Sequence, residues 1–175
     1  MDNRIKEHLE QLESEINDQG WDGAPKIWIL AQEDDALSWQ VLGKLKPGDH
    51  PADHLEMMAG FGARLPANVL GLAVINEGWA HPEYILKEMA DLKDNPGEAA
   101  KFYKGLGAPS SYEDRQELRI CTIAFRDGTT AGFTRFRERP EIEWNDQETQ
   151  MGGRVVDSMR AMFGLEPIPI PWMEQ

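Results

Sequence analysis

The chain has one cysteine, few basic residues and no long apolar run. It carries 18 Lys and Arg against 31 Asp and Glu among 175 residues, which gives a formal net charge of -13 at pH 7. This shortage of cations disfavours direct binding of nucleic acid, because such binding depends on Lys and Arg that replace the counterions of the phosphate backbone. The lone Cys121 has no partner for an internal disulfide, so we expect a small buried hydrophobe in a reducing compartment.

Nothing in the sequence predicts export or membrane insertion. The longest strongly apolar stretch, VLGLAVI at residues 69–75, is far shorter than the roughly 20 residues that cross a bilayer. The first residues, MDNRIKEHLEQLESEI, place apolar side chains at helical spacing among acidic ones, which is unlike a secretory signal. With 41% hydrophobic and 28% charged residues, the composition is that of a soluble globular protein. We therefore expect a cytoplasmic protein without membrane contact.

Hydrophobic periodicity and turn residues predict an α+β fold. Helices are expected at residues 2–18, 82–93, 97–105 and 154–163, and strands at residues 26–32, 69–79, 117–126 and 129–139. Another helix is expected to begin at Pro51, to carry Leu55, Met58 and Phe61 on its inner face, and to be closed by Gly60, Gly62 and Pro66. A further short helix is expected to carry Leu37, Val41 and Leu42. The order of these elements predicts a single domain at residues 1–164, with a mostly antiparallel sheet of about four strands and helices packed mainly on one face. A proline-rich tail follows at residues 165–175.

The best-defined predicted feature is a β-hairpin with its turn at Asp127-Gly128. These residue types suit the positive φ angles of a type I′ turn, and an even-numbered loop pairs Arg126 with Thr129. An odd-numbered loop exchanges the residues that share a face. With the even loop, the core face carries Cys121, Ile123, Phe125, Thr134 and Phe136. The opposite face carries Leu118, Ile120, Thr122 and Ala124 together with Ala131, Phe133, Arg135 and Arg137.

Arg135, Arg137 and Arg139 alternate along the second strand of this hairpin, so we expect them on one face. One interpretation is a solvated strip whose heads pair with carboxylates and whose charge protects a sheet edge from aggregation. The other is a groove over Phe133 in which the arginines bind an anion or a partner protein. Both interpretations stay open at this point.

The segment DHPADHLE at residues 49–56 has the composition of a metal site, with His50 and His54 four residues apart. However, His50 precedes Pro51 and is expected at the helix cap, and the full H-E-x-x-H motif is absent. Acidic residues in a first helical turn are also favoured by the helix dipole. We therefore expect no bound metal.

Glu77 and His81 follow the buried strand at residues 69–79, where catalytic groups often lie. An ordinary turn explains the same residues. The serines lie in no nucleophile elbow, and a phosphate-binding loop is absent. We therefore expect no cofactor, and no catalytic constellation identifies an enzyme.

Three tryptophans are expected in two different environments, the core and the C-terminal tail. We expect Trp28 and Trp79 in the core, because both lie in predicted strands. Trp172 lies among the prolines of the tail, where it either folds back onto the domain or docks in a partner protein.

Four stretches together resemble uncharacterised small proteins of actinobacteria and their phages. They are GWDGAPKIWIL, VLGLAVINEGW, EDRQELRICTIAFRDGTTAGFTRFRE and GGRVVDSMRAMFG. The shared pattern is a strand, an Asp-Gly hairpin and a closing helix. The resemblance implies a lineage-restricted cytoplasmic protein, and it brings no activity, cofactor or site residue.

Three functions are compatible with the sequence. The first is a non-catalytic accessory or protein-interaction protein, suggested by the acidic ends of the chain and the proline-rich tail. The second is an enzyme or binding protein for a small anionic ligand that uses the Arg135 and Arg137 strip or Glu77 and His81. The third is an acidic decoy of a nucleic-acid-binding protein, which requires the carboxylates of both ends on one face.

Overall fold

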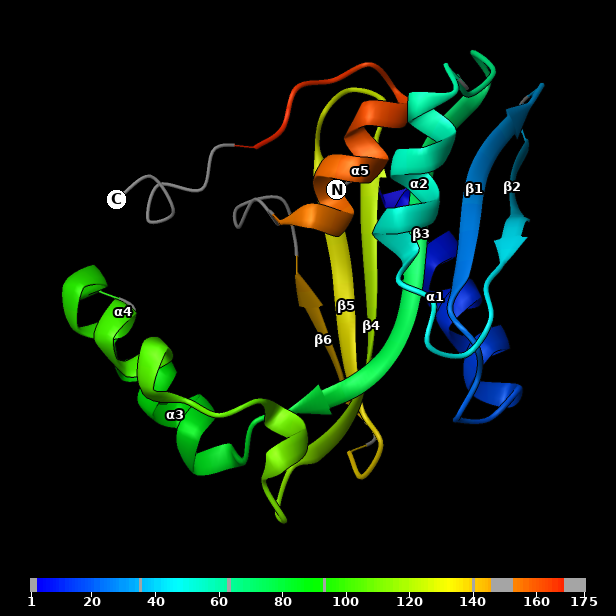
Figure 1. The fold of residues 1–175 in the computed structure, drawn as a ribbon. Helices are drawn as coiled ribbons and strands as arrows, with labels where there is room; N and C mark the ends of the chain where they lie inside the picture. The colour runs from blue at the N-terminus through cyan, green and yellow to red at the C-terminus, as the bar shows by residue number, and fades with distance from the viewer. Residues whose placement is uncertain are drawn as a thin grey trace.

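A single antiparallel sheet of six strands organises the molecule (Figure 1). The computed structural model describes residues 3–34, 36–62, 64–92, 94–139, 141–145 and 153–168. The strands are β1 (Lys26–Glu33), β2 (Ala36–Lys44), β3 (Val69–Ala80), β4 (Gln116–Phe125), β5 (Thr130–Phe136) and β6 (Ile142–Asn145). Their spatial order is β2-β1-β3-β4-β5-β6, and every neighbouring pair is antiparallel. The α+β class is confirmed, whereas the expected number of about four strands was too low.

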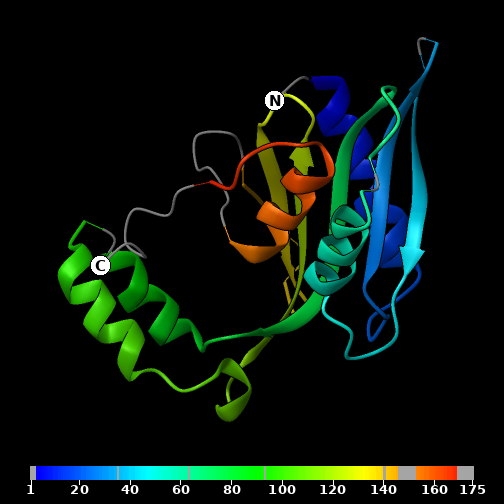
Figure 2. The same cartoon turned by 45° about the horizontal axis from the view of Figure 1, so that its top comes forward.

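Helices cover both faces of this sheet. Helix α1 (Asn3–Asp18) lies on one face, and α2 (Pro51–Gly60) and α5 (Arg154–Met162) lie on the other (Figures 1 and 2). The expectation of helices mainly on one face is therefore corrected. None of the described helices is long and apolar enough to cross a membrane.

The α1 face holds the larger hydrophobic cluster. Leu9, Leu12 and Ile16 recur at helical spacing, so they point together from α1 onto the sheet. Beneath them lie Trp28, Leu30, Ala73, Ile75, Cys121, Ile123, Phe125, Ala131 and Phe133. Cys121 is fully buried, as we expected for a small hydrophobe.

The opposite face is packed by α2 and α5. Leu55 of α2 and Val156, Met159 and Met162 of α5 cover Ile27, Leu72, Val74 and Ala124 of the sheet. At the surface, Arg154 joins the two helices, since its Nε donates to Glu56 Oε1 at 2.8 Å and its Nη2 donates to Asp53 Oδ1 at 2.5 Å. The chain after α5 is also attached, because the Ile168 N–H donates to Asp157 Oδ1 at 3.0 Å.

Strand β2 replaces the short helix that we expected around Leu37, Val41 and Leu42. Leu37, Trp39 and Val41 lie on alternate positions and face the same side of the ladder as Leu30 and Trp28 of β1. Asp34 has a φ of 53° and belongs to a tight turn, not to a helix cap. Leu37 and Val41 are four residues apart, which also fits a helix, so the apolar spacing was ambiguous.

The β4–β5 hairpin has a three-residue loop instead of the predicted two-residue type I′ turn. Gly128 has a φ of 91°, Asp127 has no positive φ, and the Gly128 N–H donates to Phe125 O at 3.0 Å. This is a type I turn followed by a left-handed glycine. The register therefore pairs Cys121 with Phe133. Phe133 and Arg135 consequently lie on the α1 face, whereas Thr134 and Phe136 lie on the α2 and α5 face, which reverses our assignment for β5.

The chain between β3 and β4 makes a helical excursion. It contains α3 (Glu83–Asp91), α4 (Pro96–Gly105) and a short 3-10 helix (Pro109–Ser111). Helices α3 and α4 project away from the sheet in both ribbon views (Figures 1 and 2). Leu86 of α3 packs against the small cluster of Ala80, Leu118 and Phe136 at the base of the excursion.

Candidate functional site

Arg135 is a buried ion-pair partner, not a member of a solvated strip. Its side chain is 16% exposed and forms a bidentate pair with Glu13 of α1, in which Nη2 donates to Oε2 at 2.9 Å and Nε donates to Oε1. Glu13 itself is buried. The pair holds α1 against the sheet. It agrees with the expected pairing of the Arg135 head with a carboxylate of the acidic N-terminal part, whereas the expected exposure of that head to solvent is corrected.

Arg137 and Arg139 lie beyond the end of β5 and point to different places. Arg137 Nη1 donates to Glu117 Oε2 at 2.6 Å, and this hydrogen bond raises the pKa of the Arg137 guanidinium. Arg139 Nη2 donates to Gln116 Oε1 at 2.9 Å, and its guanidinium lies 4.6 Å from the centre of the Phe136 ring. Phe136 belongs to the α2 and α5 face, so the three arginines do not form one strip.

Phe133 does not form the floor of a groove. It is fully buried beneath α1, and its ring meets the Trp144 ring edge-on with centroids 5.4 Å apart. The groove over Phe133, one of the two interpretations of the arginines, is therefore absent from the described residues. Trp172 lies outside the described residues.

The structure pairs Glu77 with a residue that the sequence did not single out. Arg119 on β4 is directly opposite Glu77 on β3, and its Nη2 donates to Glu77 Oε1 and to the Gly20 carbonyl, both at 2.6 Å. Arg119 is fully buried, and its guanidinium lies 4.6 Å from the centre of the Trp21 ring. Its Nη1 has no hydrogen-bond partner among the described residues, and the Trp21 ring supplies a cation–π contact instead.

Glu77 also organises the loop between α1 and β1. Its Oε2 accepts hydrogen bonds from the backbone N–H groups of Asp22 at 2.6 Å and Gly23 at 3.1 Å. Glu77 is therefore occupied by structural partners. His81 instead packs edge-on against Tyr112, with centroids 5.3 Å apart, so the two candidate catalytic residues are not brought together.

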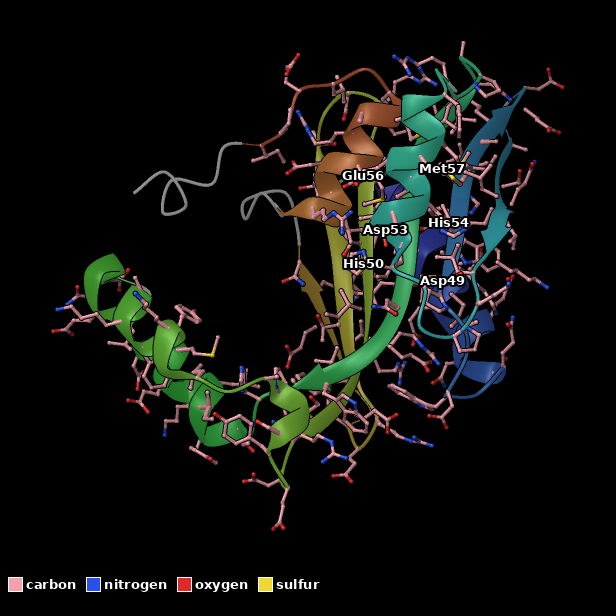
Figure 3. All side chains as sticks on the ribbon, in the orientation of Figure 1. Asp49, His50, Asp53, His54, Glu56 and Met57 are labelled. Atoms are coloured by element: carbon pink, nitrogen blue, oxygen red, sulfur yellow. The ribbon has the colours of Figure 1, made fainter. Side chains whose placement is uncertain are left out.

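The residues at 49–56 have individual structural roles. His50 caps α2 by accepting the Ala52 N–H at Nδ1, at 3.2 Å, and Asp49 Oδ2 accepts the Lys46 N–H at 2.9 Å. His54 lies on the β1 side of α2, whereas His50 lies on the β4 side (Figure 3). In the described part of the chain, no group of three or more His, Cys, Asp or Glu residues is arranged to hold a metal ion.

Two grooves meet at Trp79. The first, which we call the edge groove, has a volume of about 440 Å³ and lies between β3 and the loops at residues 22–25 and 47–51. The second, the outer groove, has a volume of about 740 Å³ and lies between the helical excursion and the chain after β5. Trp79 and Glu117 are register partners on β3 and β4, and both line both grooves. Trp79 is 43% exposed, so our expectation that it lies in the core was wrong.

Carboxylates dominate the walls of both grooves. The acidic lining residues are Asp22, Asp49, Glu77, Glu83, Glu113, Asp114, Glu117 and Glu138, and the arginines are Arg115, Arg137 and Arg139. These are eight carboxylates against three guanidinium groups. Arg115 lies 4.3 Å from the centre of the Trp79 ring, so one aromatic face already holds a cation.

Comparison with known proteins does not identify a function for this site. No family model, curated protein or solved structure matches the chain.

Proposed function

We propose that the protein is a non-catalytic protein-interaction protein that binds a basic segment of a partner at the two grooves around Trp79. The observation that carries the proposal is the excess of carboxylates over arginines around an exposed tryptophan. Such a surface attracts Lys and Arg side chains electrostatically and speeds the encounter with a basic partner.

The pairing of the arginines favours a cationic ligand over the anionic one that the sequence also allowed. Arg135 is paired with Glu13, Arg137 with Glu117, and Arg139 lies 3.7 Å from both Glu83 and Glu143. An anion would have to compete with these carboxylates for the guanidinium groups of Arg135, Arg137 and Arg139, whereas Arg115 donates to the Tyr112 carbonyl at 3.0 Å and lies over Trp79. A cation meets less competition at the carboxylates, since Asp49 forms no ion pair with a described side chain and Asp22 has only the 3.6 Å contact with Arg137, which also pairs with Glu117.

Trp79 supplies the second part of the recognition. Aromatic rings bind guanidinium and ammonium groups over their faces, and tryptophan binds them best. Arg115 already occupies one face of the Trp79 ring at 4.3 Å, and the ring is 43% exposed, so a cation of the partner would bind at the surface of the ring that Arg115 leaves uncovered. Partly exposed tryptophans are also frequent among the residues that dominate protein–protein binding energy.

Two observations favour this function over the alternatives. Cys121 is fully buried, and burial raises the pKa of its thiol, so it is unsuited to act as a nucleophile. The decoy function requires the carboxylates of both ends on one face, and α5 contributes little to it, because Asp157 is the one carboxylate of that helix. We therefore place recognition of a basic protein segment first.

The proposal is tested with two peptides of about eight residues, in which Thr alternates with Arg or with Glu. We expect the basic peptide to bind and to lose affinity as salt rises, and the acidic peptide not to bind. Asp22→Asn should weaken binding about three- to tenfold, because it removes a wall charge without changing shape. Glu33→Gln is the matched control, since it changes net charge equally at the opposite end of β1.

Calorimetry or fluorescence anisotropy measures both affinities. Equal weakening by Asp22→Asn and Glu33→Gln would show that only net charge matters, and would contradict a site at Trp79. Stronger binding of the acidic peptide would contradict the proposal and favour an anionic ligand bound by the arginines.

A further inference from the structure

The edge groove runs along the end of β3, where β3 has no neighbouring strand on its β1 side. The ladder between β1 and β3 begins at the pair of Lys26 and Ile75, whereas β3 continues to Ala80. On its other side, β3 stays paired with β4 through Gln116. Figure 1 shows the end of β3 bending away from the start of β1.

The hydrogen-bonding groups of two residues point into this gap. The Arg126 N–H donates to Leu70 O, so even-numbered residues of β3 direct their backbone groups toward β4. Alternation then directs the N–H and C=O groups of Glu77 and Trp79 toward the open side. Within the described residues, no backbone hydrogen bond joins these groups to the loops across the groove. An open edge of this kind is a template for another strand.

The chain's own residues are kept off this edge. Ala24 would lie opposite Glu77 if β1 extended by two more residues, but the Glu77 carboxylate holds the Asp22 and Gly23 N–H groups over the α1 face. Asp22 adopts a φ of 68° in this turn, which also interrupts an extended chain. The edge is therefore left open by a specific contact.

The chemistry of the walls identifies the occupant. The lining of the edge groove contains Asp22, Asp49, Glu77 and Glu117 and no Lys or Arg. Glu77 pairs with Arg119 and Glu117 with Arg137, and Arg137 also lies 3.6 Å from the exposed Asp22, while Asp49 on the opposite wall forms no ion pair with a described side chain. A second copy of this chain carries a net charge of -13 and is repelled by the same walls.

We infer that a basic, extended peptide segment binds in the edge groove as an added β-strand in line with β1, paired with Glu77 and Trp79 of β3. Backbone hydrogen bonds supply the common part of such binding, and side-chain positions supply selectivity. In a hydrogen-bonded antiparallel pair, the two residues share a face. The residues that pair with Glu77 and Trp79 thus direct their side chains to the α1 face, beside Asp22 and Glu117.

The inference rests on the proposed function and is tested separately from it. The probe is the same peptide of alternating Thr and Arg, made in two forms with methylated backbone amides. In one form the backbone nitrogen of every Arg is methylated, and in the other the backbone nitrogen of every Thr. Methylation removes the backbone donors along one edge of the peptide and leaves its charge unchanged. We expect methylation at Arg to weaken binding at least about tenfold, and methylation at Thr to weaken it less than about threefold.

Hydrogen exchange supplies an independent readout. Binding of the parent peptide should slow exchange of the Glu77 and Trp79 amides, whereas the Asn76 and Gly78 amides are already paired with β4. The Asp127 amide at the far end of the β4–β5 hairpin is the internal control and should not change.

The outcomes distinguish recognition of a basic segment from strand addition at β3. If the basic peptide binds but both methylated forms bind equally well, recognition of basic segments stands and strand addition is wrong. If neither peptide binds, both proposals are wrong. If the protein dimerises and dimerisation alone protects the Glu77 and Trp79 amides, a second copy occupies the edge and the inference is overturned.

Discussion

Arg119 and Glu77 face each other directly across β4 and β3, and the arginine of this pair is fully buried. Arg119 reaches the Gly20 carbonyl on one side while Glu77 reaches the Asp22 and Gly23 amides on the other. The pair therefore joins two central strands to the loop that follows α1. Because Glu77 lines the edge groove, the pair also fixes one wall of that groove.

Replacing Arg119 should be strongly destabilising. In Arg119→Leu, the Glu77 carboxylate loses its charged partner, and breaking a buried pair in this way costs about 3 to 5 kcal/mol of the free energy of unfolding. Urea denaturation measures the loss. Arg137→Leu is the control, because its pair with Glu117 is 43% exposed on the arginine side and screened by solvent, so its loss should lower stability far less. The double variant Arg119→Met with Glu77→Leu should recover part of the loss, because it removes the unpaired charge but leaves the Asp22 and Gly23 amides and the Gly20 carbonyl without these partners. A double variant no more stable than Arg119→Leu would show that the hydrogen bonds to the loop, and not the unpaired charge, account for the loss.

The Gly128 turn should be sensitive to a side chain for a backbone reason. A Cβ at Gly128 would lie 3.6 Å from Arg160 Nη1, which is an ordinary contact, but the φ of 91° disfavours any β-branched residue. Gly128→Val should therefore cost about 1 to 3 kcal/mol. Thermal denaturation measures it, with Gly105→Ala as the control at a helical position that has open space. An unchanged melting temperature for Gly128→Val would contradict the observed turn.

The Glu56 contact with Arg154 should make stability fall in acid. The Arg154 hydrogen bond lowers the pKa of Glu56 below its ordinary value of 4.5. A lowered pKa in the folded state contributes stability that is present above the unfolded value and is lost as the pH falls through the folded one. The stability difference between the native sequence and Glu56→Gln should thus shrink between about pH 6 and pH 3. Arg154→Gln removes the hydrogen bond that lowers the pKa of Glu56, so the free energy of unfolding of this variant should fall less steeply over the same pH range. An unchanged fall in both variants would show that other carboxylates dominate the acid sensitivity.

Cys121 should be inert in the folded protein. Burial raises the pKa of its thiol, and the reactive form is the thiolate. We expect negligible alkylation by iodoacetamide at about pH 8 in buffer and complete alkylation in denaturant. Rapid labelling without denaturant would show either local opening of β4 or an error in its face assignment.

Much of the fold was predictable because its signals are local. The helices α1, α2 and α5 repeat apolar residues at helical spacing, and the residue before α2 is a cap followed by Pro51, so these elements were expected close to their observed bounds. The apolar centre of β3 likewise predicted a central strand, which it is. By contrast, β2 has an apolar spacing that fits a helix as well as a strand, and β6 has only four residues.

The candidate site was less predictable because register and long-range pairing decide it. Asp127-Gly128 suits loops of two or three residues, and the difference of one residue moved Phe133 and Arg135 from one face to the other. Arg119 is 42 residues from Glu77, so no local pattern joins them. One signal was available, since Arg119 interrupts the alternating apolar positions of Cys121, Ile123 and Phe125 and so required a buried partner.

The helical excursion between β3 and β4 departs and returns at adjacent points of the sheet. Ala80 and Gln116 are register partners, so the residues between them are topologically a long hairpin loop. A short turn can join the two strands in their place, and the shortened chain keeps all six strands and the three helices that cover the sheet. The outer groove would vanish with α3 while most of the edge groove would remain. The sheet with α1, α2 and α5 is thus separable from the α3–α4 excursion. Replacing the excursion can alter what the outer groove recognises while most of the edge groove stays the same.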